Sequence, residues 1–414
     1  MAQDLAPHRS GGRPFTLAPF RGLRFDPATV GDLSTVISPP YDVLDAETVR
    51  TLENANRRNI VRLILSRRFE RPYLAVRERL EKWRDKSFLR ADDDPTLYLY
   101  EYSAEGVTVR GLIGLVGLRT EDEHVILPHE DVMPAPVDDR TVLMRTTRTN
   151  LEPILLTHTG TDGLRRLLDD IASGAPVSDF VALDGSGHRL WTLTDPALHT
   201  AVADELAGTV ALIADGHHRY AAYLRLQAEL RGDDTAPGTS PWDHGLAMLV
   251  DEEEGALRIG PIHRSVAALT LSDLQDLADD RGDRFTACPD REAAFAAFAA
   301  LGAPDRREAS FVVSDGRSWG VLTVARTHEV DAAVLHETLL PAWHIAEEQV
   351  GYHHSLDQAL HATTRTPGLV VAVRPPTVAE VRASAARGVR MPRKSTSFGP
   401  KPRMGVVMRD LRDA

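Results

Sequence analysis

The stretch VALIADGHHRYAAYLRLQAEL occupies residues 210–230. Its first five residues are apolar and have the length of one buried strand. A polar break follows at 215–219, and Tyr223, Leu226 and Leu230 then recur at the spacing of one helix face. This order predicts a strand that turns sharply into a helix beginning near residue 220.

The polar break has the residue types of an anion site. A helix start leaves backbone N–H groups without intrahelical partners, and the helix dipole adds positive character there. Gly216 allows the backbone to approach a bulky ligand, and Arg219 offers a planar fork that matches phosphate oxygens. The alternative is that residues 215–219 form an ordinary turn, in which Asp215 only caps the helix and His217 and His218 fill the turn. Five polar residues together favour phosphate binding.

Several segments carry a resemblance to known proteins. DGHHRYAAY resembles the phosphate-binding turn of the ParB/sulfiredoxin-like superfamily. The whole chain resembles the domain of unknown function 1015 family of that superfamily, through PPYDV at 39–43, PHE at 128–130, IHR at 262–264 and MPRKSTSFGPK at 391–401. This resemblance implies an α/β fold with mixed sheets. The best-understood relatives of this family are kinases that phosphorylate free L-serine with ADP or ATP, so the resemblance implies a related activity.

Length and composition restrict the class of protein. With 414 residues, 43% apolar and 26% charged, the chain is typical of a soluble protein of two or three domains. A net charge of -12 argues against general binding to nucleic acid or to anionic membranes. The single cysteine, Cys288, cannot form an internal disulfide, and no apolar run approaches 18 residues. We therefore expect a cytoplasmic protein without a membrane span.

Changes in periodicity predict three parts. Residues 1–95 are expected to pack on a central ParB/sulfiredoxin-like nucleotide-binding domain at 96–268, which opens with a β-hairpin from 97 to 118. After 269 the composition shifts to Ala-rich helices. Residues 269–414 are expected to form a second α/β domain, with a hairpin across Asp315–Gly316 and a basic capping loop near its end.

An acidic cluster is the second candidate for chemistry. In the serine kinases that the chain resembles, a Pro-His-Glu stretch carries the glutamate that takes the proton of the substrate hydroxyl. The resemblance implies this role for Glu130, and we group His129 and Asp215 with it as catalytic candidates. A carboxylate beside bound phosphate suits either a general base or a Mg²⁺ ligand. An exposed acidic loop would explain the same residues.

Further polar residues are candidates for the nucleotide site, each with a plainer alternative. Tyr41 and Asp42 follow Pro39–Pro40, and Arg140 lies in a helix expected from residue 137. His263 and Arg264 lie at the end of an expected strand. The late basic loop carries Lys394, Ser395, Thr396 and Lys401. Basic and hydroxyl groups on a Pro/Gly-framed loop suit phosphate binding. The alternatives are a turn, surface charge pairing and a disordered cationic tail.

The sequence therefore predicts an ATP- or ADP-dependent phosphotransferase that acts on a small hydroxylated metabolite, with Mg²⁺ bridging the donor phosphates. The alternative is a non-catalytic nucleotide-binding regulatory module of the ParB-like type. The two histidines at 353 and 354 with Asp357 offer no third ligand by spacing, so no protein-only metal site is expected. The acceptor and the oligomeric state stay open, a homodimer included.

Overall fold

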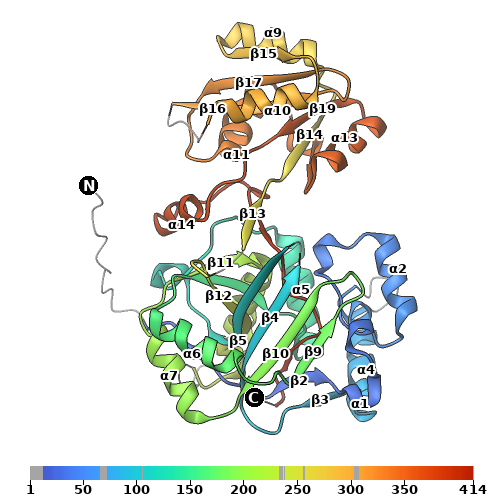
Figure 1. Ribbon diagram of the computed structural model, residues 1–414, viewed down its shortest axis with the longest axis vertical. Coiled ribbons are helices and arrows are strands. Elements are labelled where there is room, and N and C mark those ends of the chain that lie inside the picture. The colour runs from blue at the N-terminus through green and yellow to red at the C-terminus, as the bar shows by residue number, and fades with distance from the viewer. Residues whose placement is uncertain are drawn as a thin grey trace. The chain divides into compact units, whose positions relative to one another are not determined.

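The computed structural model describes residues 13–65, 72–104, 106–232, 236, 238–254, 257–302 and 307–413, except for the side chain of Asp42. The role that the sequence predicts for Asp42 lies outside the described atoms. The chain divides into two compact units (Figure 1). Unit 1 comprises Met1–Pro128, Val132–Leu257 and Pro400–Ala414, and unit 2 comprises His129–Asp131 and Arg258–Gly399.

A large mixed sheet forms the centre of unit 1. Its strands run in the order β6 (Ile126–Leu127), β11 (Ala211–Asp215), β8 (Ile154–His158), β12 (His244–Asp251), β5 (Val107–Gly117), β4 (Leu97–Ala104), β10 (Gly187–Leu193) and β9 (Ser178–Val181), and β1 (Leu17–Ala18) pairs with β5. The pairs β6–β11 and β8–β12 are parallel and the others antiparallel. The predicted mixed α/β architecture and the β4–β5 hairpin are confirmed.

A second sheet of unit 1 joins distant parts of the chain. Its order is β3 (Leu89–Ala91), β2 (Gly22–Phe25), β21 (Met408–Asp410) and β7 (Thr149–Asn150). The last strand of the chain therefore lies between two strands from the first 150 residues. The helices of unit 1 are α1 (Pro27–Val30), α2 (Ala46–Ala55), α3 (Val61–Ile64), α4 (Pro72–Asp85), α5 (Pro134–Thr147), α6 (Asp162–Ala172), α7 (Pro196–Leu206) and α8 (His217–Leu230).

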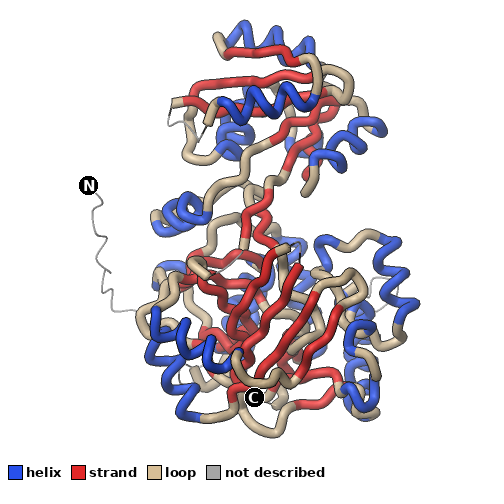
Figure 2. Tube along the Cα trace, viewed as in Figure 1, coloured by secondary structure: helices blue, strands red, loops and turns tan. Residues whose placement is uncertain are grey.

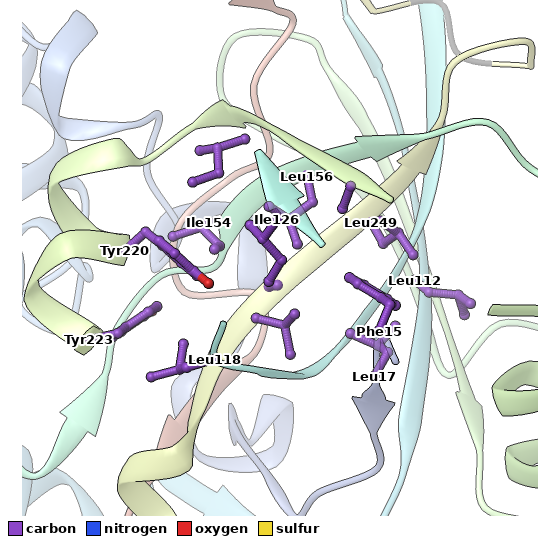
Figure 3. Packing of buried hydrophobic residues seen from close by; sticks show 14 of the residues in the cluster. Phe15, Leu17, Leu112, Leu118, Ile126, Ile154, Leu156, Tyr220, Tyr223 and Leu249 are labelled. Carbon is purple, nitrogen blue, oxygen red and sulfur yellow. The ribbon is translucent and has the colours of Figure 1, made fainter. Parts of the chain in front are cut away.

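Helix α8 is anchored to the large sheet by its aromatic residues. Tyr220 and Tyr223 are buried in the same apolar cluster as Ile154 of β8 and Leu118 after β5 (Figure 3). Burying each large apolar side chain stabilises the fold by about 1.5–3 kcal/mol. The start of α8 is therefore held firmly at the end of β11.

Unit 2 contains a sheet of its own, whose strands are red in Figure 2. It has six strands, and all of its pairs are antiparallel. The order is β15 (Arg284–Cys288), β17 (Trp319–Ala325), β16 (Glu308–Ser314), β19 (Gly368–Ala372), β14 (His263–Ala267) and β18 (Val350–His353). Phe311 and Val313 belong to one apolar cluster and Val312 to another, so both faces of β16 are covered. The predicted hairpin across Asp315–Gly316 is confirmed as β16–β17.

The helices of unit 2 are α9 (Leu271–Arg281), α10 (Arg291–Ala300), α11 (Asp331–Ala333), a π-helical segment at Val334–Leu339, α12 (Leu340–Ala342), α13 (Leu356–Arg365) and α14 (Val378–Ala386). A separate two-stranded ladder joins β13 (Arg258–Gly260) to β20 (Ser397–Gly399). Within the described ranges, no helix has the length and apolar content needed to cross a membrane.

Candidate functional site

The predicted passage from strand to helix is confirmed, with an earlier helix start. β11 ends at Asp215 and α8 begins at His217, so Gly216 is the one residue between them. The two histidines and Arg219 lie in the first turn because Gly216 alone reverses the chain direction. Tyr223 and Leu226 of the predicted helix face are buried, whereas Leu230, the last residue of α8, is 37% exposed.

Gly216 is required at this turn for two reasons. Its φ of 100° lies in the left-handed region that favours glycine. A Cβ here would also lie 2.8 Å from the side chain of Ile154. Gly216 is the N-cap residue, and no side chain caps α8. The alternative in which Asp215 is a helix cap is therefore wrong.

Arg219 is buried in a set of carboxylates. Its guanidinium pairs with Asp215, lies 3.5 Å from Glu152 and donates a hydrogen bond of 2.6 Å to the carbonyl of Pro153. Burial lowers the pKa of Arg219, but Glu152 and Asp215 outweigh this effect, so the pKa lies above its ordinary value. Sequence reasoning missed Glu152, whose one signal in the sequence is its charge two residues before the buried strand β8.

Two further candidates join this network in unit 1. Arg140 pairs with Asp139 and lies 3.9 Å from Glu152. Its guanidinium also lies 5.0 Å from the ring centre of Tyr41. The structure thus brings Tyr41, Arg140 and Arg219 around one buried glutamate, although 178 residues separate the first from the last. The pairing of Arg140 with a neighbouring aspartate, which the sequence left open, is present.

Lys401 reaches the same network from the end of the chain. Its Nζ lies 2.5 Å from Oδ1 of Asp215. The hydroxyl of Tyr102 donates a bond of 2.6 Å to the carbonyl of Pro400, which holds the segment in place. Burial raises the pKa of Asp215, but Lys401 and Arg219 lower it further, to about 2. Asp215 is therefore ionised at neutral pH.

The depressed pKa of Asp215 predicts a pH-dependent stability. Because the folded-state pKa of about 2 lies below the ordinary 3.8, ionised Asp215 stabilises unit 1 at pH 7 by about 2 kcal/mol. That contribution is expected to disappear progressively as the pH falls from about 4 to about 2. Urea unfolding of the wild type and Asp215→Asn across this range measures it. A stability gap that stays constant from pH 7 to pH 2 would contradict the assignment.

The two histidines of the turn differ in position. Nε2 of His218 accepts a 3.0 Å hydrogen bond from the backbone N–H of Met133, which ties α8 to the start of α5. His217 is half-buried and its charge would favour ionised Asp215. In chemical terms, unit 1 offers an uncapped helix start beside an ionised carboxylate and the cation of Lys401.

The remaining candidates lie in unit 2, where Glu130 is held by the late basic loop. Its Oε1 accepts hydrogen bonds from the backbone N–H of Ser395 (3.1 Å), the backbone N–H of Thr396 (3.0 Å) and the Thr396 hydroxyl (2.8 Å). Burial raises the pKa of Glu130, and the bonds from Thr396 oppose this without cancelling it. Nε2 of the buried His129 lies 2.8 Å from the same hydroxyl.

Arg264 supports this loop from β14. Its guanidinium is fully buried, contacts Nε2 of His336 at 3.0 Å and donates a 3.0 Å bond to the carbonyl of Lys394. Burial lowers the pKa of Arg264 to about 10. His263 accepts a hydrogen bond of 3.4 Å from the backbone N–H of Val373. The alternative of a disordered tail at 391–399 is therefore wrong, because buried side chains hold this loop.

The candidate residues thus form one set in unit 1 and another in unit 2. The family description "Protein of unknown function (DUF1015)" matches residues 17–345. The chain belongs to the DUF1015 family. Comparison with curated proteins gave no match.

Solved structures similar to this DUF1015 protein share little sequence with it. A mutant of free serine kinase in complex with ADP is 14% identical, with a TM-score of 0.38 over 72% of this chain and 91% of that one. A conserved hypothetical protein from Pyrococcus furiosus is 15% identical, with a TM-score of 0.37 over 73% and 96%. SbnI with a C-terminal truncation, from Staphylococcus aureus, is 13% identical, with a TM-score of 0.38 over 70% and 84%.

Proposed function

We propose that this protein is a nucleotide-dependent phosphotransferase that uses ATP or ADP and acts on a small hydroxylated metabolite. One observation carries the proposal: α8 begins without a side-chain cap, beside an Asp215 that Lys401 and Arg219 keep ionised. The resemblance of DGHHRYAAY to a ParB/sulfiredoxin-like phosphate turn supports it, and we assign unit 1 to that fold class on the same strand–turn–helix passage.

The charges of unit 1 explain why a divalent cation is needed. Three cations, Arg140, Arg219 and Lys401, face three carboxylates, Asp139, Glu152 and Asp215. Because these charges cancel, a polyphosphate needs additional positive charge. The α8 start supplies part of it, and bound Mg²⁺ would neutralise charge on the transferred group.

Each residue of the proposed nucleotide site has a defined task. The first-turn amides of α8 and the Nζ of Lys401 bind phosphate oxygens, and Gly216 leaves room for their approach. Asp215 is 23% exposed at its side chain and ionised, so it could serve as a Mg²⁺ ligand. Arg219 and Glu152 hold Asp215 and the turn in position.

Glu130 is the proposed proton acceptor. Its Oε1 is held by the backbone N–H groups of Ser395 and Thr396 and by the Thr396 hydroxyl. A carboxylate oriented in this way, with a pKa raised by burial, suits proton abstraction from an acceptor hydroxyl. His129 acts on the same loop through Thr396.

A second function, a nucleotide-responsive regulatory module, is favoured by a different feature. The ion-pair network is complete without nucleotide, so a bound phosphate must compete with Asp215 for Lys401. Such competition would release the segment that begins at Pro400 and change its conformation. Turnover separates the two functions, because a regulator binds nucleotide without forming a phosphorylated product.

Replacing Lys401 tests the nucleotide site directly. Since a hydrogen bond to a charged group contributes about 1.5–3 kcal/mol, Lys401→Ala is expected to weaken Mg²⁺–ATP binding roughly 10- to 150-fold. Isothermal titration calorimetry on the full chain measures this. Lys86→Ala, which removes an exposed lysine of the same unit, is the matched control. Equal affinities for the two variants would refute the site.

A further inference from the structure

The hydroxyl of Thr396 has the surroundings of a reacting hydroxyl. It lies 2.8 Å from Oε1 of Glu130 and 2.8 Å from Nε2 of His129. An ionised carboxylate can only accept, so the hydroxyl donates its proton to Glu130 and the imidazole N–H donates to the hydroxyl. This leaves one lone pair of the hydroxyl oxygen for attack, with a base already on its proton.

The side chain of Thr396 is accessible, and the same loop carries two exposed cations. Its side chain is half-buried, and two cationic residues earlier in the loop, Arg393 and Lys394, are exposed. Lys394 adopts a φ of 60°, and the amides that follow it turn toward the Glu130 carboxylate. These amides are occupied by Glu130, so the groups left to attract phosphate oxygens are the exposed cations of Arg393 and Lys394.

The neighbouring hydroxyls lack these surroundings. The Ser395 hydroxyl donates to the carbonyl of Pro392 at 2.6 Å. The Ser397 hydroxyl lies 3.1 Å from Nδ1 of His354. Among the described residues neither of these hydroxyls contacts a carboxylate, so of the three hydroxyls of the loop Thr396 has the carboxylate base.

We propose that Thr396 is itself a phosphoryl acceptor, so that the protein phosphorylates its own loop with a nucleoside phosphate as donor. This inference rests on the proposed function, because it uses the phosphotransfer chemistry and the base assigned there. It adds a modification site, and a phosphate at Thr396 would break the hydrogen bond that now holds Glu130.

The chemical step balances. The Oγ1 of Thr396 forms a bond to the terminal phosphorus of the donor as the bond from that phosphorus to its bridging oxygen breaks. The nucleotide leaves with one phosphate fewer and takes the electron pair of that bond. The proton of Oγ1 passes to Oε1 of Glu130 and from there to solvent.

Labelling of the full-length protein tests this inference. The protein is incubated with Mg²⁺ and terminally labelled ATP, or with ADP, and no other acceptor, and the site is mapped by fragmentation mass spectrometry. We expect phosphothreonine at position 396. Thr396→Val should abolish the label, and Thr396→Ser should convert it to phosphoserine at the same position. Ser397→Ala should keep it, and Glu130→Gln should slow it at least about 100-fold.

The outcomes separate this inference from the proposed function. A wild-type protein that binds nucleotide or phosphorylates an added metabolite but carries no label overturns the inference alone. Label at Ser395 or Ser397 overturns it too. A folded protein that binds neither ATP nor ADP overturns both proposals.

Discussion

In Glu130→Gln, phosphoryl transfer is expected to slow by about 10²- to 10⁴-fold, the contribution of a positioned general base. The amide keeps an oxygen that can accept from the Ser395 and Thr396 N–H groups, so the loop should stay in place. It cannot take a proton. The rate constant kcat, measured with a coupled assay for the released nucleotide, should therefore fall while nucleotide affinity stays near that of the wild type.

Asp131→Asn is the matched control for this result. Asp131 is the next residue, but its side chain is 67% exposed and lies 3.8 Å from Arg390. Its replacement should leave kcat within about twofold, since exposed pairs contribute only about 0–1 kcal/mol. Equal kcat in wild type and Glu130→Gln would remove Glu130 from the mechanism and favour the regulatory function.

Arg219→Ala is expected to destabilise unit 1 by about 3–5 kcal/mol. The change leaves Glu152, which is 7% exposed, with the more distant Arg140, and removes Arg219 from Asp215, which keeps its ion pair with Lys401. Removing one partner of a buried ion pair lowers the stability by more than the intact pair contributes, because the remaining charge stays buried without a partner. Hydrogen exchange of the α8 and β11 amides measures the loss within unit 1.

The same helix provides the control for Arg219. Arg225 also pairs with two carboxylates, Asp138 and Glu229, but its side chain is 47% exposed. Arg225→Ala should therefore cost less than about 1 kcal/mol. Similar losses for the two variants would mean that burial does not set the energy of the Arg219 network.

Local features were predictable from the sequence because their causes lie within a few residues. The apolar run before Asp215 has strand length, and Gly216 can adopt the left-handed conformation that the turn needs. The hairpins β4–β5 and β16–β17 follow from alternating apolar residues and short turns. The helix start was placed three residues late because histidine and arginine carry no strong start signal.

The residues that contact the candidate site residues could not be predicted from the sequence. From the sequence alone, Arg219 is predicted to be a phosphate ligand. In the structure its guanidinium lies 3.5 Å from Glu152, a residue that belongs to none of the sequence motifs. Glu130 and Thr396 are 266 residues apart, and their contact depends on the bridge between Glu130 and Met391. No local spacing selects among so many possible partners, since long-range contacts are chosen by packing of the whole chain.

The sequence by itself determined the strand, the glycine turn and the helix at 211–230, because strand length, φ preference and helical periodicity are local properties. Only the tertiary structure decided that Lys401 lies against Asp215 and that residues 129–131 fold with unit 2. The physical reason is that charge pairs form where burial brings them together, and burial is a property of the assembled sheets.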